Sequence, residues 1–450
     1  MRFKETKESN RSLILSIGRF AIPVTLSVFF QRMFNIIDTM MAGKSVGADA
    51  LAAVGSTSTI TGTILGLGAG FALGSNILVA KTLGENNHKK LEEMIQLSVW
   101  AVVVIGAISG VIGVAFSRQF LLWLNTPADI LEQAVLYMRI YCVGMIGLLL
   151  YDTGSSVLRG LGDSKGPFYA LAIAGIANIV MKLVFVVVFD AGILGLALAT
   201  TLTQYISAIC VLFLIIRRKG VRCLLLQKQT SYINSLKELS IIAISAVFES
   251  VFFSVANLVF QSSLNSLGSD AVAGYSIGSQ IEGFVYPTMT CFYYAALSFV
   301  SQNYGAGKYK VIDKVLGICC GYVMLSWCIF GGLVYLCKIP LLGMFTDEPM
   351  AIEYGLLHLQ VMIPIYFLVG LQEVLRASVR GMNRSVCATI GSMLFYGIVR
   401  VAWIGTVFQK THNFQVLILS VPVSYMAAII GFAVIYFIVR RRQRDNLSAC

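Results

Sequence analysis

Charged residues are scarce in this chain of 450 residues, where they make up only 12% of the sequence while hydrophobic residues make up 57%. The mean hydropathy is correspondingly high, at +0.80. About a quarter of the residues of an ordinary soluble domain are charged, and a chain this apolar could not present its surface to water. The shortage of charge therefore excludes a soluble globular protein and predicts an integral membrane protein.

Histidine is rare as well, and cysteine occurs without the spacings that bind metals. The three histidines, His88, His358 and His412, lie far apart in the sequence, in or near predicted loops. The ten cysteines include no CxxC pair and no histidine at ligand spacing. We therefore expect them to be small apolar packing residues, without a disulfide framework or a metal site. With no catalytic constellation in view, the chain is not expected to be an enzyme.

Long apolar runs are what the chain has in abundance. Twelve of them are long enough to cross a hydrocarbon core of about 30 Å. No small-residue cleavage site follows the first run, so we expect no removable signal peptide. The sequence predicts an all-α membrane protein with twelve spans: 13–42, 50–80, 93–117, 131–157, 167–190, 192–216, 236–265, 272–303, 312–336, 352–379, 386–408 and 414–439.

The sparse polar residues of the first six spans return in the last six at one constant separation. The run Ser45–Ala52 returns as Ser266–Ala273, and Arg159 returns as Arg380 with the same displacement and without a gap. Chance does not readily place acidic and basic residues in register over such a length. Six spans per half is an even number, so both halves enter the membrane from the same side. We expect a parallel internal repeat, which is typical of secondary transporters.

The repeat predicts two six-helix lobes, residues 1–219 and 236–450, joined by a polar cytoplasmic linker, 220–235. With the N-terminus inside, the inner segments carry 25 Lys and Arg residues and the outer segments four: Lys44, Arg118, Lys338 and Lys410. This bias predicts a multi-pass plasma-membrane protein with both termini in the cytoplasm.

The net charge of +12 is then a topology signal, and it does not call for a nucleic-acid partner. Basic clusters such as Arg440–Arg444 are expected to contact anionic headgroups of the membrane lipids.

Short motifs along the whole chain resemble a known family. They are Pro23, Asn35–Gly43, Ala50–Gly55, Val79–Gly84 and Leu158–Asp163 in the first half, and Glu249, Ser301–Gly307 and Val379–Met382 in the second. Their order and spacing resemble the multidrug and toxic compound extrusion (MATE) transporters. The resemblance implies a twelve-helix antiporter whose lobes rock, and which exports small drug-like organic compounds, often cationic, in exchange for H⁺ or Na⁺. We expect a monomer in a bacterial inner membrane, with no cofactor besides the transported coupling cation.

The first predicted span carries a polar stripe, in which Gln31 and Asn35 precede Asp38 at helical spacing. The resemblance implies that Asp38 is the carboxylate of the N-terminal lobe that takes up a proton or cation. In the family a second acid usually follows Asn178 by four residues, but this chain has Lys182 there. Asp38 and Lys182 are predicted at similar depth. They could form a structural ion pair, a pair that takes part in coupling, or no contact.

The second half holds two further candidates for the coupling site, since a charge near the bilayer centre costs about 3 kcal/mol and needs a partner or a purpose. Glu249 is predicted near the midplane and matches the family's seventh-helix glutamate. Glu373 is the other candidate, and Arg376, three residues later, is its alternative partner. Arg400 is a candidate partner of Glu249. Relatives with an aspartate earlier in the tenth helix find Val369 near that place here, which argues against a Na⁺ site of that type.

Other polar residues in the spans either line a substrate cavity or join helices by hydrogen bonds. The candidates for the substrate cavity are Gln31, Asn35, Asn178, Asn257, Gln261 and Gln280. Pro23 is expected to kink its helix for gating. Arg159 and Arg380, which the repeat places at equivalent inner corners, are expected to be scaffold residues.

Two functions stay open at this point. The first is cation-coupled export of small organic compounds, cationic ones above all. The alternative, from the same wider superfamily, is a flippase or exporter of a lipid-linked glycan or another anionic amphiphile. It would need a basic cavity, and Arg32, Lys182 and Arg400 are candidates to line one.

Overall fold

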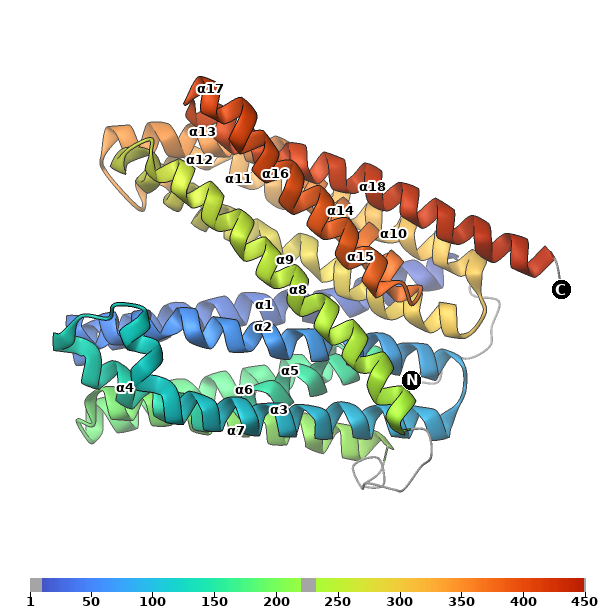
Figure 1. The fold of residues 1–450 in the computed structure, drawn as a ribbon, viewed down its shortest axis with the longest axis horizontal. Helices are drawn as coiled ribbons and strands as arrows, with labels where there is room; N and C mark the ends of the chain where they lie inside the picture. Colours follow the sequence, from blue (N-terminus) through green and yellow to red (C-terminus); the bar gives the residue numbers. More distant parts are fainter. Residues whose placement is uncertain (1–9, 220–231, 449–450) are drawn as a thin grey trace. The chain divides into compact units, whose positions relative to one another are not determined.

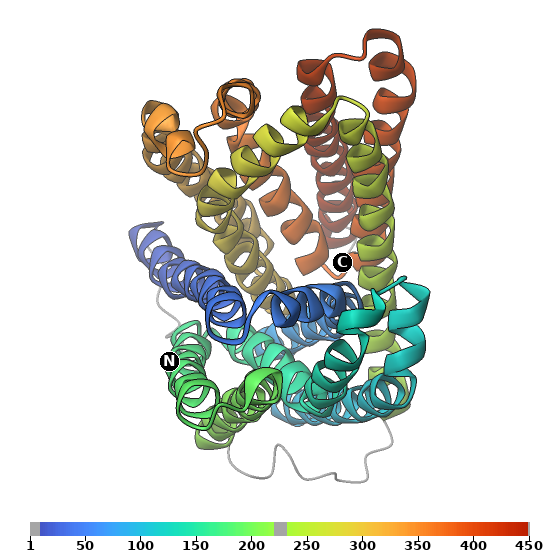
Figure 2. The same ribbon diagram turned by 90° about the vertical axis from the view of Figure 1, so that its left-hand side faces the viewer.

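The structure, a computed structural model, describes residues 10–219 and 232–448, and every element in these ranges is a helix (Figures 1 and 2). Nine of the helices are long and apolar enough to cross a membrane, and two bent helix pairs raise the number of candidate spans in the described ranges to eleven. The prediction of an all-α membrane protein is confirmed.

The two halves contain the following elements, in which η marks a π-helical segment. The first half consists of α1 (Asn10–Met41), η1 (Ala42–Val46), α2 (Ala48–Gly84), α3 (His88–Trp123), α4 (Ala128–Val143), α5 (Met145–Gly160), α6 (Lys165–Lys182), η2 (Leu183–Val188) and α7 (Gly192–Lys219). The second half consists of α8 (Tyr232–Asn265), α9 (Ser269–Gly305), α10 (Tyr309–Ser326), η4 (Trp327–Gly331), α11 (Gly332–Leu336), α12 (Lys338–Gly343), α13 (Pro349–Ile365), α14 (Phe367–Gly381), α15 (Ser385–Ser392), η5 (Met393–Ile398), α16 (Val399–Trp403), η6 (Ile404–Phe408), α17 (Gln409–Thr411) and α18 (Phe414–Ser448).

The predicted span 272–303 is the one that is not among the candidate spans. Its residues form α9, a helix of 37 residues that is long enough to cross a bilayer. Polar residues such as Gln280 and Glu282 lower the hydropathy of this helix, whereas its counterpart α2 is a candidate span. The helix α9 therefore matches α2 in length but is less apolar. If α9 crosses the membrane, its polar side chains need hydrogen-bond partners inside the protein.

The repeat is visible in the backbone. Both bounds of α9 are displaced from those of α2 by the separation that relates Arg380 to Arg159, and α10 begins at the same displacement from the start of α3. The pair α4 and α5 is bent by 48°, and the equivalent pair α13 and α14 by 47°. Gly47 and Gly268, which precede α2 and α9, both adopt positive φ values, of 122° and 98°. Only glycine takes this conformation without strain, which explains why the repeat keeps it at this turn.

The chain packs as two compact units, one formed by Leu26–Val247 and the other by the residues up to Thr25 together with those from Phe248 on. In the unit that contains the residues from Phe248 on, the start of α1 packs against helices from the second half of the sequence. Lys314 Nζ donates to Asn10 Oδ1 over 2.9 Å, and Phe20 meets Phe299 edge to face at 5.7 Å. These two units are defined by which residues pack together. The predicted lobes 1–219 and 236–450 are instead the parts that we expect to move during transport, and this division of the chain stays a prediction.

Close helix packing within Leu26–Val247 depends on Gly70 of α2. A Cβ atom at residue 70 would lie 2.5 Å from the backbone oxygen of Ala243 on α8, a separation that no relaxed structure allows. At Gly66, one turn earlier on the same helix, a Cβ atom would meet nothing within 4 Å. The two glycines thus lie on the same helix, but only Gly70 is in close contact with another helix.

We expect Gly70→Ala to lower the free energy of unfolding by about 1–3 kcal/mol, because the added methyl group forces α2 and α8 apart. Gly66→Ala should be neutral or stabilising by about 0.5–1 kcal/mol, since alanine is the better helix former. Thermal unfolding of both variants in the same detergent measures the difference. Equal midpoints for the two variants would contradict the close approach at Gly70.

Candidate functional site

Asp38 and Lys182 form an ion pair within the unit Leu26–Val247. The Lys182 side chain is 2% exposed and the Asp38 side chain 35%. An ammonium group so deeply buried costs several kcal/mol unless a carboxylate offsets it. Lys182 is the last residue of α6 and stands directly before the π-helical segment η2, a kind of irregularity that is frequent at functional sites. Of the three arrangements considered from the sequence, the one without contact is excluded.

The other predicted cavity residues of this unit do not join the ion pair. Asn178 is buried, and its amide donates to Thr203 Oγ1 over 3.2 Å, which links α6 to α7. Gln31 and Asn35 lie on the exposed face of α1, next to the half-buried Asp38. Asn178 therefore joins two helices, and a place for Gln31 and Asn35 in a substrate cavity stays a prediction.

Four charged side chains meet in the other unit: Glu249 of α8 and Glu373, Arg376 and Arg380 of α14. We call them the four-charge cluster. Arg376 Nη1 lies 2.5 Å from Glu249 Oε1, Arg376 also pairs with Glu373, and Arg380 pairs with Glu249. The cluster holds two negative and two positive charges, and none of its side chains is more than 17% exposed.

The geometry of the cluster follows from the spacing on α14. Residues 373, 376 and 380 lie on one face of a helix, so that both arginines point toward α8, where Glu249 lies. Three neutral groups complete the cluster: Gln372 donates to Glu373 Oε1 (2.9 Å), Thr389 to Glu249 Oε2 (3.3 Å), and Arg380 to the Tyr293 hydroxyl (2.7 Å). All four carboxylate oxygens of the cluster thus accept a hydrogen bond from the protein.

Arg400 does not pair with Glu249, contrary to the sequence-based prediction. Thr389 contacts Glu249 from the start of the eleventh span, and Arg400 stands eleven residues later, about 16 Å further along the span. At that distance the side chain cannot reach Glu249, whereas Arg376 and Arg380 contact it directly.

The surroundings of Arg400 are polar and aromatic. It belongs to α16, between the π-helical segments η5 and η6, and it is 4% exposed. Its guanidinium donates to Asn257 Oδ1 and to Ser424 Oγ, both over 3.3 Å, and it lies within 6 Å of the ring centres of Phe253 and Tyr425. Within the described residues it forms no ion pair with a carboxylate.

A further acid of the same unit, Glu282, is largely buried and has a histidine as its neighbour. The expectation that His358 lies in or near a loop was wrong: it belongs to α13 and is 2% exposed, with Nε2 3.0 Å from Glu282 Oε1 of α9. Its ring also meets Tyr275 edge to face at 5.0 Å. The predicted span 352–379 already contains residue 358, and that position was the signal for a buried histidine.

The remaining predicted site residues are scattered. Gln261 donates to Asn265 Oδ1 on its own helix over 2.9 Å, and Gln280 is exposed on α9. Pro23 is buried inside α1, and Arg159 stands in the last turn of α5, as Arg380 does in α14. In the part of the chain that the structure describes, no group of three or more His, Cys, Asp or Glu side chains is placed to hold a metal ion.

A helical membrane protein with two repeated halves and buried, paired charges in each unit has the organisation of a secondary transporter. The family model MatE matches the chain twice, over residues 23–184 and 245–406, which confirms the repeat. The chain therefore belongs to the MATE family of multi-pass membrane transporters, which are not enzymes.

Individual relatives match over nearly the full length. YoeA of Bacillus subtilis, named a probable multidrug resistance protein, is 26% identical over 456 aligned positions, which cover 98% of this chain and 97% of YoeA. The bent form of the Vibrio cholerae MATE transporter VcmN superposes with a TM-score of 0.90 at 19% identity, over 96% of this chain and 98% of VcmN. A MOP superfamily transporter from Pyrococcus furiosus superposes with a TM-score of 0.86 at 16% identity, over 98% of this chain and all of that one (100%). The two structures establish the fold.

Proposed function

We propose that this transporter exports small organic compounds, that an inward flow of protons drives it, and that the four-charge cluster is the coupling site. The observation that carries the proposal is the state of the cluster's carboxylates. Each of the four oxygens of Glu249 and Glu373 already accepts a hydrogen bond from a protein group. A hard metal cation such as Na⁺ needs free oxygen ligands, whereas a proton needs only one carboxylate oxygen.

Protonation would change the balance of the cluster. With Glu249 neutral, its charge-assisted bonds to Arg376 and Arg380 weaken to ordinary hydrogen bonds, and both guanidinium groups compete for Glu373. Alternating access requires two states, and two arrangements of the cluster that the proton selects between would supply them as the lobes 1–219 and 236–450 rock. Most of the predicted linker 220–235 lies outside the described residues. One proton that crosses 100 mV releases about 2.3 kcal/mol, which sustains a gradient of about fortyfold for an uncharged substrate. A monovalent cation that moves outward in exchange cancels this contribution, and the pH difference then drives export, at about tenfold per pH unit.

Two substrate classes are candidates. Cationic drug-like compounds are favoured by the family and by relatives such as YoeA, which is named a probable multidrug resistance protein. Anionic amphiphiles are favoured by Arg400, which is buried next to two aromatic rings and has no carboxylate partner within the described residues. The Pyrococcus furiosus relative is described as having a binding pocket of reverse polarity that suggests a different function. We place the protein in the plasma membrane with both termini in the cytoplasm, on the distribution of Lys and Arg.

Dye export from a pump-deficient bacterium tests this function. We expect the chain to lower the accumulation of a monovalent cationic fluorescent dye roughly tenfold, which one proton per dye molecule sustains at a pH difference of about one unit. A protonophore should abolish the effect, and replacement of external Na⁺ by K⁺ should not. An anionic dye run in parallel decides between the substrate classes. Dependence on Na⁺ alone would contradict proton coupling, and unchanged accumulation of every dye would contradict export.

A further inference from the structure

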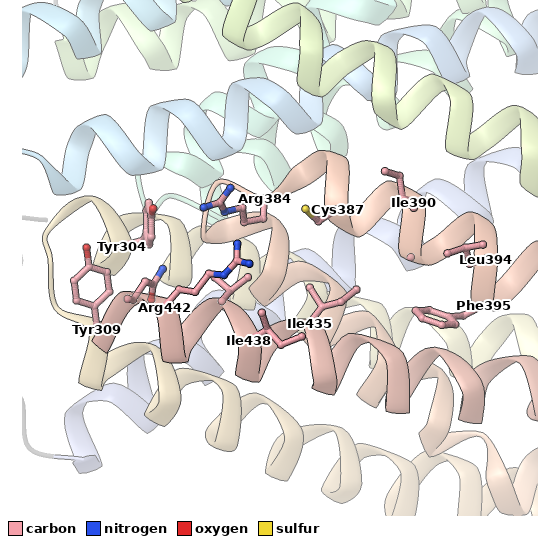
Figure 3. Close-up of a pocket in the computed structure, with 13 residues that line it drawn as sticks. Tyr304, Tyr309, Arg384, Cys387, Ile390, Leu394, Phe395, Ile435, Ile438 and Arg442 are labelled. Carbon is pink, nitrogen blue, oxygen red and sulfur yellow. The ribbon is translucent and has the colours of Figure 1, made fainter. Parts of the chain in front are cut away.

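The unit that contains the residues from Phe248 on has a cavity of about 540 Å³, and no member of the four-charge cluster lines it (Figure 3). Its walls come from the first turns of the eleventh span, from the last turns of α18, from the end of α9 (Tyr304) and from the start of α10 (Tyr309). The volume falls in the range of about 300–1,000 Å³ that small-molecule sites occupy in proteins.

The two ends of the cavity differ in polarity. Arg384 and Arg442 lie at the end where Tyr304 and Tyr309 stand, as Figure 3 shows. The other end is hydrocarbon, formed by the side chains Ile390, Leu394, Phe395, Ile435 and Ile438. A ligand that fits both ends has a polar head and an apolar tail.

The positive charge at the polar end is available to a ligand. The neighbouring Arg440 is buried and neutralised by Asp313, with Nη2 2.5 Å from Oδ2 and Nε 2.9 Å from Oδ1, and it donates to the backbone oxygen of Tyr309 over 3.0 Å. These bonds fix one wall of the cavity. Arg384 and Arg442 are exposed, and no ion pair with either of them exists among the side chains that the structure describes.

The cavity has the depth of one lipid leaflet. Arg384 directly precedes the candidate span Ser385–Thr411, and Arg442 stands in the last turn of the candidate span Phe414–Gln443, so both lie at the level of the headgroups. From Arg384 to Leu394 the helix advances by about 15 Å, which is half of a hydrocarbon core of about 30 Å. The hydrocarbon end of the cavity therefore reaches the middle of the bilayer.

We propose that this cavity binds an anionic phospholipid, with its phosphate between Arg384 and Arg442 and one acyl chain along the hydrocarbon end. In the proposed topology the lipid comes from the cytoplasmic leaflet. The acyl chain exchanges one hydrocarbon environment for another, so it adds little selectivity. Selectivity between lipids therefore comes from the charge of the headgroup. Two arginines favour binding of an anionic over a zwitterionic headgroup by roughly tenfold or more. The cavity and the four-charge cluster share no residue, and occupancy of the cavity does not depend on the proposed export function.

Native mass spectrometry of the purified full-length protein with phosphatidylglycerol or phosphatidylcholine tests the site. We expect phosphatidylglycerol to be retained roughly tenfold better. The double variant Arg384→Gln/Arg442→Gln should lose this preference, and the charge-matched control Arg441→Gln/Lys89→Gln, which leaves the cavity unchanged, should keep it. Ile390→Trp, which fills the hydrocarbon end and leaves both arginines in place, should lower retention as well. Equal loss in the control, or equal retention of both lipids by the unmodified chain, would overturn the proposal.

A native cysteine gives a second readout. Cys387 lines the cavity and is exposed, while Cys328, also exposed, lies outside it. Phosphatidylglycerol should slow maleimide labelling of Cys387 several-fold and leave Cys328 unchanged, as peptide mapping of the labelled protein would show. In Arg384→Gln/Arg442→Gln the protection should disappear. Protection by an anionic dye without any by phosphatidylglycerol would overturn the lipid assignment in favour of a drug pocket.

Discussion

Lys182→Ala is expected to lower the free energy of unfolding by about 3 kcal/mol, the low end of the range for breaking a buried ion pair. The low end applies because Asp38 keeps 35% of its side chain exposed and water screens part of the charge left behind. The loss corresponds to a fall of about 6–12 °C in Tm for a unit of this size. Thermal unfolding of the purified protein in detergent measures it.

The double variant Asp38→Asn/Lys182→Met separates the charge effect from packing. It removes both charges and keeps the volume, so most of the lost stability should return, since neutral replacement of a buried pair is often neutral or stabilising. Lys89→Ala, at an exposed position of the same unit, is the control and should change Tm little. If the double variant is as unstable as Lys182→Ala, the contribution of Lys182 to the free energy of unfolding does not come from the ion pair.

Glu249→Gln is expected to abolish concentrative export, so that the substrate gradient falls from about tenfold per unit of imposed pH difference to none. Glutamine keeps the shape and the hydrogen-bonding oxygen of Glu249 but cannot bind a proton in the physiological range. Proteoliposomes with an imposed pH gradient and a fluorescent substrate measure the effect.

A loss of folding is distinguished from a loss of coupling by exchange of labelled substrate at equilibrium, which needs no proton. Glu249→Gln should retain this exchange while uphill export disappears. Glu353→Gln removes an exposed carboxylate of the same unit and should behave like the unmodified chain. Uphill export by Glu249→Gln at the normal level would refute the assignment of Glu249 as a coupling residue.

The sequence predicted the scaffold well because the scaffold is repeated and simple. Turn glycines such as Gly47 and Gly268 and the long apolar runs mark the ends and the number of the helices. The bend between α4 and α5 falls at Gly144, but glycines also occur inside unbroken helices such as α2, and the predicted span 131–157 reads as one apolar run. The π-helical segments η2 and η6 are changes of backbone hydrogen-bond register, which composition does not encode.

The site was harder to predict, because the depth of a residue in the membrane had to be estimated by counting residues along a predicted span. Asp38 and Lys182 could be placed at similar depth from their positions in two spans, and the structure brings them together. Arg400 was matched to Glu249 on the same argument, but depth counted from span ends is uncertain by several residues, or several ångströms. Arg376 and Arg380 both contact Glu249. From the sequence, Arg376 was assigned to Glu373 and Arg380 to the scaffold, because the face that α14 turns toward α8 cannot be derived from either helix alone.

The closely similar bends of 48° and 47°, and the matching bounds of α2 and α9, give the molecule an internal reference for mutagenesis. Any scaffold position can be altered either at one residue or at its repeat equivalent in the same chain, with membrane, expression level and assay held constant. A lesion that weakens the protein equally at both places reports on the shared architecture. A substitution that weakens only one half reports on the local chemistry of that half.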